Sequence, residues 1–260
     1  MKTIAIMNNK GGVGKTVTAV NLADILVRDC GKTVVLCDCD GQMNLTRFFL
    51  PGFDPEVCPN LADVFTGDAE PAWSDNLVPV CPGLDLLPGS PALYDLDLRA
   101  VRDGAGDPYA LRRFCEAAVS DGETDYILFD CPPGYTLASV AALLAADEVV
   151  VPMLLDGFSF TGMLDIQTQL EGLREAICTT GKQVDIAGVL LTQWHNSEVV
   201  RQGEQLVRDM GVPVFRTVIR RTDKVPESTF ERTPIVRYSP TSAAARDYRT
   251  WVQEYFGENM

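Results

Sequence analysis

The chain has 260 residues, of which 46% are hydrophobic and 22% charged, a balance typical of a soluble globular protein. No stretch approaches the roughly 20 consecutive apolar residues of a membrane span, and the N-terminus has no basic region followed by an apolar one. We therefore expect a cytoplasmic protein, and the net charge of −14 argues against one that coats nucleic acid with its whole surface.

The first predicted elements are a strand over residues 3–7, a glycine-rich loop, and a helix that starts near residue 16. Such a strand, loop and helix are the context of a phosphate-binding loop, because glycines let backbone N–H groups surround an anion. In this loop Lys15 would reach the β- and γ-phosphates, and the Thr16 hydroxyl would bind Mg²⁺. The alternative is a glycine turn that only happens to precede a helix. The predicted nucleotide-binding residues are Gly11, Gly12, Val13, Gly14, Lys15, Thr16 and Val17.

A second strand is predicted over residues 33–38, and two carboxylates, Asp38 and Asp40, follow its buried part. Carboxylates at the C-terminal end of a strand lie where ligands bind in an open parallel sheet. The alternative is an acidic turn that caps the next helix. The two carboxylates lie about 25 residues after the glycine-rich loop. Alone they are a weak signal of a nucleotide site, and together with the loop they are a strong one.

The region over residues 51–106 is rich in proline and glycine and has the least regular pattern. It predicts a short helix over 61–65 and a strand over 84–88, and we interpret it as surface elaboration of the same domain. The sequence then predicts a helix with Asp107 as N-cap and Pro108 in its first turn. That helix is expected to run to about Ser120 and to end at Gly122.

The next strand, over residues 125–130, is an apolar run that ends in Asp130. This is the Walker B pattern, in which the aspartate holds the Mg²⁺ water shell. Further elements are predicted as strands over 145–152, 184–192 and 214–219 and a helix over 160–178. The alternation predicts a doubly wound α/β fold, a mostly parallel sheet with helices on both faces, in one domain over residues 1–260.

Several of these motifs resemble those of one family. The loop Lys10-Gly11-Gly12-Val13-Gly14-Lys15-Thr16 resembles the deviant Walker A loop of the ParA/MinD ATPases, a branch of the P-loop NTPases. Residues 38–46 resemble the family's DxDPQxNLT signature, with Gly41 in place of proline and Met43 in place of the usual glycine. Asp130 with the two prolines that follow matches its DxPP motif. Val17 replaces a second threonine, and position 220 is arginine where relatives often have proline.

The resemblance implies roles for three residues. Lys10 would cross a dimer interface and touch the partner's nucleotide, so that hydrolysis depends on dimerisation. Asp40 would orient and activate the attacking water, and Asp38 would support the Mg²⁺ shell.

The match covers nearly the whole chain and is closest to the ParA/Soj partition ATPases in their short form. Such proteins bind ATP and Mg²⁺, form an ATP-dependent sandwich homodimer, and in that state bind DNA without sequence preference. A ParB-like centromere-binding partner then stimulates hydrolysis. The resemblance thus implies a nucleoid-associated cytoplasmic ATPase that segregates DNA.

Basic residues near the C-terminus are the candidates for DNA contact. Residues 201–249 contain ten basic and six acidic residues, a net charge of +4, so the rest of the chain carries −18. Phosphate contact requires only clustered positive charge. Alternatively, several of these side chains are solvated helix charges paired with acidic neighbours. The candidates are Arg201, Arg208, Arg216, Arg220, Arg221, Lys224, Arg232 and Arg237.

Two other functions share this fold. A MinD-like membrane-cycling ATPase would need a basic amphipathic C-terminal helix. Here the apolar stripe Tyr248, Trp251, Val252, Tyr255 and Phe256 lies among acidic and neutral residues, so we expect it to pack on the core and expect no membrane partner. An iron–sulfur carrier would need shared cysteine ligands. Cys131, next to Asp130, is poorly placed for that role, and Cys37-x-Cys39 fits no standard metal spacing.

Overall fold

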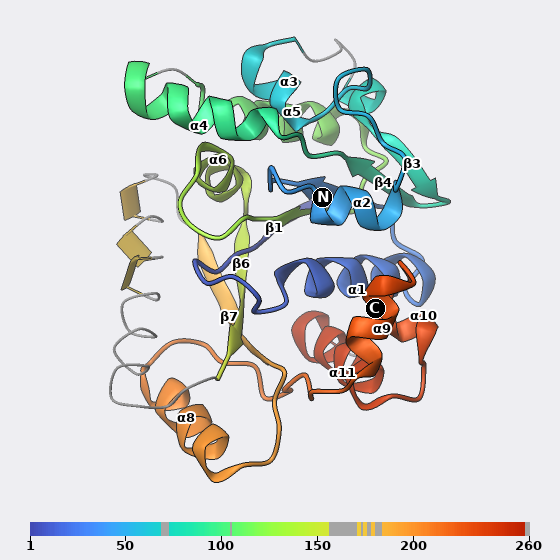
Figure 1. Cartoon of the computed structure of the whole chain (residues 1–260), viewed down its shortest axis with the longest axis vertical. Coiled ribbons are helices and arrows are strands. Elements are labelled where there is room, and N and C mark those ends of the chain that lie inside the picture. The colour runs from blue at the N-terminus through green and yellow to red at the C-terminus, as the bar shows by residue number, and fades with distance from the viewer. Residues whose placement is uncertain are drawn as a thin grey trace.

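A twisted β-sheet forms the centre of the computed structural model, which describes residues 1–68, 73–104, 106–155, 171–172, 174–175, 178–179 and 184–257. In this part of the chain the sheet has seven strands in the order β3-β4-β2-β5-β1-β6-β7 (Figure 1). Neighbouring strands are parallel except β3 and β4. The strands are β1 (Lys2–Ile6), β2 (Val34–Asp38), β3 (Val78–Cys81), β4 (Leu84–Leu87), β5 (Tyr126–Asp130), β6 (Glu148–Leu154) and β7 (Asp185–Thr192).

The central strands are apolar along nearly their whole length because both faces of the sheet are covered. Alternate residues of β1 point to opposite sides: Ile4 and Ile6 belong to one hydrophobic cluster, and Ala5 belongs to the other. All three side chains are fully buried. The predicted doubly wound arrangement with helices on both faces is therefore confirmed.

One face of the sheet is covered by α1 (Lys15–Arg28), α10 (Ile235–Tyr238) and α11 (Ala243–Phe256), and the other by α3 (Leu61–Thr66), α5 (Ala110–Asp121) and α6 (Leu137–Ala145) (Figure 1). The aromatic stripe of α11 packs inward as expected, since Trp251 is fully buried and Tyr248 almost so. The remaining described helices are α2 (Asn44–Phe49), α4 (Ala92–Asp103), α8 (Glu198–Asp209), α9 (Lys224–Phe230) and the short 3₁₀ helix η1 (Trp73–Asn76).

Register places the carboxyl ends of three central strands together. Ile6 of β1 and Asp38 of β2 are both paired with Asp130 of β5. The loops that follow these strands must therefore leave the sheet at the same edge. Ligands of open α/β sheets bind at this edge.

Three expectations about secondary structure were wrong. Residues 51–106 are more than surface elaboration, because β4 pairs with β2 and β3 extends the sheet beyond it. The helix expected from Asp107 begins at Ala110, because the Asp107 carboxylate accepts the N–H of Tyr109 in a preceding turn, 2.9 Å away. The helix does end at Gly122, which has a φ of 73°.

The third wrong expectation is the strand over residues 214–219, which makes only isolated bridges. The N–H groups of Phe215 and Ile219 bond to carbonyl oxygens of β7, whereas those of Arg216 and Thr217 bond to the Glu254 carboxylate at 2.6 and 2.8 Å. A side chain of α11 thus takes two N–H groups in the middle of the segment, and the pairing with β7 is left as isolated bridges. The helix expected over 160–178 lies for most of its length outside the described residues.

Candidate functional site

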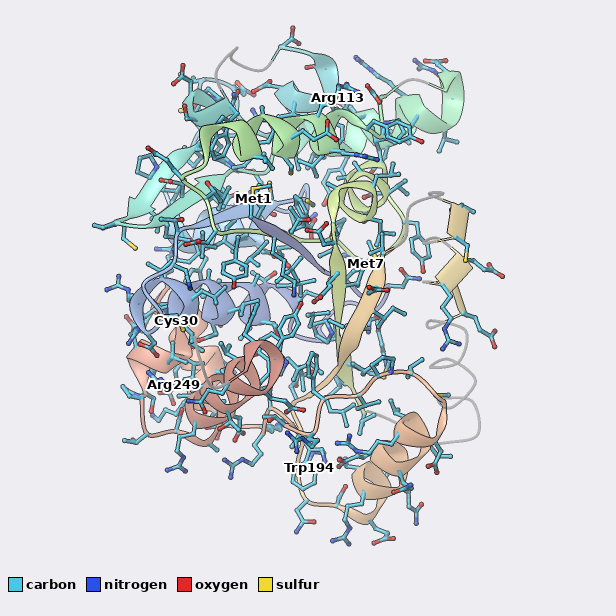
Figure 2. The ribbon with its side chains drawn as sticks, turned by 180° about the vertical axis from the view of Figure 1, so that it is seen from behind. Met1, Met7, Cys30, Arg113, Trp194 and Arg249 are labelled. Carbon is cyan, nitrogen blue, oxygen red and sulfur yellow. The ribbon has the colours of Figure 1, made fainter. Side chains whose placement is uncertain are left out.

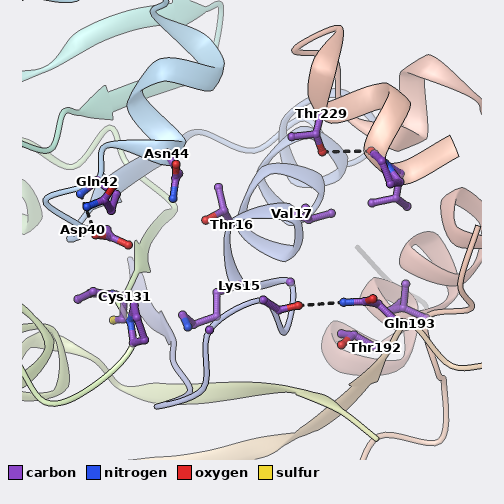
Figure 3. A pocket seen from close by; sticks show the side chains of 18 of the residues that line it. Lys15, Thr16, Val17, Asp40, Gln42, Asn44, Cys131, Thr192, Gln193 and Thr229 are labelled. Carbon is purple, nitrogen blue, oxygen red and sulfur yellow. Dashed lines mark hydrogen bonds between the residues drawn. The ribbon is translucent and has the colours of Figure 1, made fainter. Parts of the chain in front are cut away.

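A cavity of about 1050 Å³ opens at the edge where the carboxyl ends of β1, β2 and β5 meet. Among the described residues it is lined by the glycine-rich loop, the loop after β2, the loop after β5, the end of β7 and residues 219–230, together with Tyr94 of α4 and Tyr248 of α11. Figure 3 shows Lys15, Thr16 and Asp40 around the same space. The lining includes Gly11, Gly12, Gly14, Lys15, Thr16, Val17, Asp40, Gln42, Asn44, Tyr94, Cys131, Thr136, Thr192, Gln193, Arg220, Arg221, Phe230 and Tyr248.

The glycine-rich loop has the backbone that its sequence predicts. Gly12 and Gly14 have φ values of 75° and 89°, a region that residues with a side chain rarely adopt. Gly14 is also the N-cap of α1, whose first N–H groups have no partner within the helix. The first residues of that helix, Lys15 and Thr16, line the cavity. Among the predicted nucleotide-binding residues, only Val13 does not line the cavity, and its side chain is buried in the core.

Lys15 lies folded back over this loop. Its Nζ donates to the carbonyl oxygens of Asn8 at 3.0 Å and Lys10 at 2.9 Å. Burial lowers the pKa of Lys15, and the nearby charge of Asp130 opposes that shift. A cation held among backbone oxygens at the base of a cradle of N–H groups is placed to meet a phosphate.

Thr16 and Asp130 form the second feature of the cavity. The Thr16 hydroxyl donates to Oδ2 of Asp130 at 2.7 Å, whereas the buried Oδ1 has no hydrogen-bond partner. Burial, together with the charge of Asp38, raises the pKa of Asp130 to about 8. An unpaired carboxylate oxygen beside a hydroxyl is a donor set that suits Mg²⁺, which takes one or two protein ligands and completes its shell with phosphate and water.

The described residues contain no group of three or more acidic, histidine or cysteine side chains that could hold a metal ion by themselves. A metal ion at Thr16 and Asp130 would therefore need oxygens from a bound ligand. This is the arrangement expected for a metal that arrives with a nucleotide.

The two carboxylates after β2 have different surroundings. Asp38 is fully buried, and its oxygens accept bonds from the Thr46 N–H, the Thr46 hydroxyl and the Asp40 N–H at 2.8, 2.7 and 3.2 Å. Burial raises the pKa of Asp38 to about 6. Asp40 instead lines the cavity. Asp38 is therefore seen here supporting the loop that carries Asp40, and its part in a Mg²⁺ shell stays a prediction.

Met43 has an unusual backbone in the same loop. Its φ is 58°, a left-handed conformation that costs a side-chain-bearing residue about 1 kcal/mol. This conformation explains why the resembling motif has glycine at that position. The present chain has the same turn with methionine at this position, so Met43 adopts a strained backbone conformation.

Lys10 differs from Lys15 in where its side chain lies. Lys10 is exposed, whereas Lys15 is buried, and Lys10 is absent from the described lining of the cavity. Its backbone N–H is held by the Asn8 side chain at 2.9 Å. The two lysines of the loop therefore face different surroundings.

Sequence reasoning missed the contacts that hold the glycine-rich loop from behind. The Thr192 hydroxyl donates to the Val13 carbonyl at 2.8 Å. The Gln193 amide donates to the Gly12 carbonyl at 2.9 Å (Figure 3). Both residues stand at the end of β7, about 180 positions along the chain. Their position after a buried strand is the only signal that could have marked them, because nothing local links them to the loop.

The eight candidate DNA-contacting residues are not equivalent. Arg201, Arg208 and Lys224 pair with Glu198, Glu204 and Glu227 on their own helices, as the alternative of solvated helix pairs anticipated. The Arg220 guanidinium bonds to Asp247 at 2.6 Å and lines the cavity. Arg216 is 90% exposed although it lies 3.7 Å from Glu254. In the described part of the chain, Arg221 and Arg232 are exposed and have no ion pair.

Arg237 is built into the fold. Its guanidinium bonds to the buried Asp24 at 2.6 Å and to Asp29 at 2.7 Å, so α10 is tied to α1. Arg249 of α11 reaches the same Asp29 at 3.1 Å, and Figure 2 shows Arg249 near Cys30 at this end of α1. Burial raises the pKa of Asp24, and the charge of Arg237 opposes that shift.

We expect Arg237→Ala to lower the free energy of unfolding at neutral pH by about 1–3 kcal/mol, because it leaves the Asp24 carboxylate buried with only Arg28 as a partner. The deficit in the free energy of unfolding should shrink as the pH falls. The pKa of the unpaired carboxyl rises further, and its protonation removes the buried charge. Urea unfolding measures the effect, with the exposed Arg246→Ala as a control expected to change stability by less than about 0.5 kcal/mol. Equal losses in the two variants would contradict the structural role of Arg237.

The C-terminal helix and the cysteines are the features on which the two alternative functions would depend. In the described residues no helix is long and apolar enough to cross a membrane, and the apolar face of α11 is already covered by the core. Cys37, Cys39 and Cys131 are buried. Burial raises the pKa of the Cys37 thiol well above its usual range, and a hydrogen bond with Cys131 together with burial does the same for the pKa of Cys39. They are best described as small core residues.

Comparison with known proteins gives consistent matches. The model of a family described as AAA domain matches residues 1–185. The chain is 31% identical to the chromosome partitioning protein ParA of Caulobacter vibrioides, over 98% of this chain and 93% of the relative. It is 34% identical to the chromosome-partitioning ATPase Soj of Thermus thermophilus, over 98% and 95%. The septum site-determining protein MinD of Pyrococcus horikoshii, solved with Mg-ADP, superimposes with a TM-score of 0.73 at 28% identity, over 97% and 95%.

Proposed function

This chain belongs to the ParA/Soj family of chromosome-partitioning ATPases, and we propose that it is a partition ATPase whose ATP-bound homodimer binds DNA. In this proposal residues 1–260 form one ATPase domain, and a ParB-like partner stimulates hydrolysis and so releases the protein from the nucleoid. The observation that carries the proposal is the contrast between the two lysines of the glycine-rich loop: Lys15 is buried in the cavity, and Lys10 is exposed outside it.

The reaction is hydrolysis of ATP to ADP and phosphate: the bond between the β-γ bridging oxygen and the γ-phosphorus breaks as a water oxygen bonds to that phosphorus. Most of the catalysis of such a transfer comes from positioning and charge stabilisation. We assign the phosphates to the N–H groups of Gly11–Val17 and to Lys15, which would exchange its two carbonyl partners for phosphate oxygens. Asp40 is assigned to orient the attacking water.

Thr16 and Asp130 would hold Mg²⁺, whose charge, when it is bound, stabilises the phosphate oxygens. The unpaired Oδ1 of Asp130 is the atom in the described structure that most needs such a partner. Asp38 would contribute by fixing the loop of Asp40 through its bonds to Thr46 and to the Asp40 N–H. These residues act by holding and orienting groups.

Lys10 is assigned to the nucleotide of the second protomer. Lys10 is exposed and absent from the described lining of its own cavity, so it would not compete with Lys15 for the same phosphates. In a face-to-face dimer it would add positive charge to the partner's triphosphate, and hydrolysis would then require both protomers. Residues 1–260 of this chain and a second copy of them would form two complete sites together.

For DNA, the structure favours some of the candidate residues over others. Arg216, Arg221 and Arg232 are exposed, and their charges are the least committed to pairs within the described chain. Arg237 and Arg220 are held by carboxylates, so a role for them in DNA contact is less favoured. We propose that the first three contribute most to phosphate contact.

DNA binding should require ATP and Mg²⁺ and should weaken steeply with salt. We expect Arg221→Ala and Arg232→Ala each to weaken binding to any DNA sequence and to reduce the slope of log K against log salt by about one. Fluorescence anisotropy with labelled duplex in ATP, ADP and no nucleotide measures both effects. Arg112→Ala on α5, an exposed arginine paired with Glu116, is the matched control. Binding without ATP, or binding that is insensitive to salt, would contradict the proposal.

A further inference from the structure

Helix α4 packs against the loop that carries Asp40, and Tyr94 makes the contact. The Gln42 side-chain amide donates to the Tyr94 hydroxyl at 2.5 Å. The backbone N–H of the same Gln42 donates to Oδ1 of Asp40 at 2.8 Å. Gln42 therefore links Tyr94 to Asp40, and both Tyr94 and Gln42 lie at the cavity.

The Tyr94 ring also explains why residue 41 is glycine. A Cβ added to Gly41 would lie 2.8 Å from two atoms of that ring, which is closer than real contacts allow. The backbone of Gly41 is not in the left-handed region, so the ring is the feature that a side chain at this position would displace. The proline of the family motif also carries a Cβ, so Gly41 and Tyr94 form a matched pair in this chain.

The turn before α4, at Gly89, also packs closely against the loop that carries Asp40. A Cβ on Gly89 would meet the Asp40 carbonyl oxygen at 2.9 Å, and the Gly89 N–H donates to the Thr46 hydroxyl, also at 2.9 Å. Close approach of two backbones leaves little freedom for the loop to move independently. Residues 40–46 are thus held between Gly89 and Tyr94.

One turn further along, α4 is tied to the loop after β5. Oδ1 of Asp97 accepts the N–H of Leu137, the first residue of α6, at 2.7 Å. The segment between Asp130 and Leu137 includes cavity-lining residues such as Cys131 and Thr136. Helix α4 therefore contacts both loops that carry the carboxylates Asp40 and Asp130.

We propose that Tyr94 is a positioning residue for ATP hydrolysis, which sets the place of Asp40 through Gln42 and through the ring that covers Gly41. The proposal rests on the assigned role of Asp40. A carboxylate that orients water acts in the transition state, so its displacement lowers kcat with little change in KM for ATP. If Tyr94 only stabilised the fold, its substitution would lower the free energy of unfolding and would not lower kcat selectively over KM.

Tyr94→Phe keeps the ring and removes the hydroxyl. Steady-state turnover of the full chain with saturating Mg-ATP should fall about three- to tenfold, the effect of one lost hydrogen bond, with the KM for ATP changed less than about twofold. Leu98→Ala, at a position that is 68% exposed one turn along α4, is the control and should leave both constants unchanged. An unchanged kcat in Tyr94→Phe, or a change in KM alone, would overturn the proposal.

Gly41→Ala tests the ring contact independently. Its methyl group meets the Tyr94 ring, so kcat should fall in the native background. In the Tyr94→Ala background the same methyl meets open space and should cause little further loss, so the two effects should be clearly non-additive. If the fold reductions in kcat of the two single variants simply multiply in the double variant, the proposed contact between Gly41 and Tyr94 is contradicted.

Asp40→Ala, measured beside these variants, separates the two hypotheses. If Asp40→Ala loses turnover while Tyr94→Phe and Gly41→Ala retain it, the positioning role of Tyr94 is wrong and the proposed function stands. If Asp40→Ala keeps native turnover, the assigned role of Asp40 is wrong, and the inference falls with it. Loss of turnover in all three variants, with non-additive effects of the substitutions at residues 41 and 94, supports both the role of Asp40 and the positioning role of Tyr94.

Discussion

Lys15→Ala is expected to abolish ATP binding at micromolar protein concentration. Lys15 is only 8% exposed, and its Nζ is the cationic group that the loop holds within the cavity. Removing one member of a buried charge pair with phosphate costs about 2–5 kcal/mol, which corresponds to roughly 30- to 4000-fold weaker binding. Isothermal titration calorimetry with Mg-ATP measures this loss directly.

Lys10→Ala is the matched control for that experiment. It removes a lysine from the same loop, five positions away, at an exposed site outside the described cavity lining. We expect it to leave the affinity of the monomer for ATP within about twofold of native, and to remove hydrolysis that depends on dimerisation. Native ATP affinity in Lys15→Ala, or its loss in Lys10→Ala, would show that the two lysines are not divided as assigned.

Asp40→Ala is expected to separate nucleotide binding from hydrolysis. The side chain lines the cavity but makes no bond to the glycine-rich loop among the described residues, so ATP should still bind and the ATP-bound dimer should accumulate. Turnover should fall about 10²- to 10⁴-fold, the range for loss of a group that positions or deprotonates a nucleophile. Size-exclusion chromatography with light scattering, in ATP and in ADP, measures the assembly.

Glu56→Ala, which removes an exposed acidic side chain in the same N-terminal third of the chain, controls for the change in charge. It should keep native turnover and should not accumulate dimer. An Asp40→Ala protein that remains monomeric with ATP at micromolar concentration would contradict the sandwich mechanism. The mass of the ATP-loaded native protein provides the reference for both variants.

The geometry of the candidate nucleotide site was largely predictable because the residues that form it are local in sequence. Consecutive residues supply the glycines, the lysine and the hydroxyl of the loop, and the helix that follows is marked by its own run of apolar residues. Strands that end in Asp38 and Asp130 predicted where their carboxylates would lie, because parallel strands end at one edge of the sheet. The register of β2 and β5 confirms that placement.

The contacts that tune the site were not predictable from the same patterns. Tyr94 packs on Gly41 across 53 positions, and Thr192 holds Val13 across 179 positions. Neither pair has a spacing that marks it. Residues 214–219 have the β-branched and aromatic composition of a strand, yet Glu254 of a distant helix takes the N–H groups of Arg216 and Thr217, and only isolated bridges to β7 remain.

The amino-acid sequence by itself determined the layered α/β fold and the phosphate-binding loop, because apolar runs, glycines and carboxylates act over a few consecutive residues. Only the tertiary structure decided which of the basic side chains near the C-terminus are exposed and which are held in ion pairs. Arg237 looked like the other basic residues of its segment until folding placed it against Asp24, 213 positions away, where burial demands a partner. The difference is physical: a local pattern sets the backbone, whereas burial and pairing depend on which distant side chains the fold brings together.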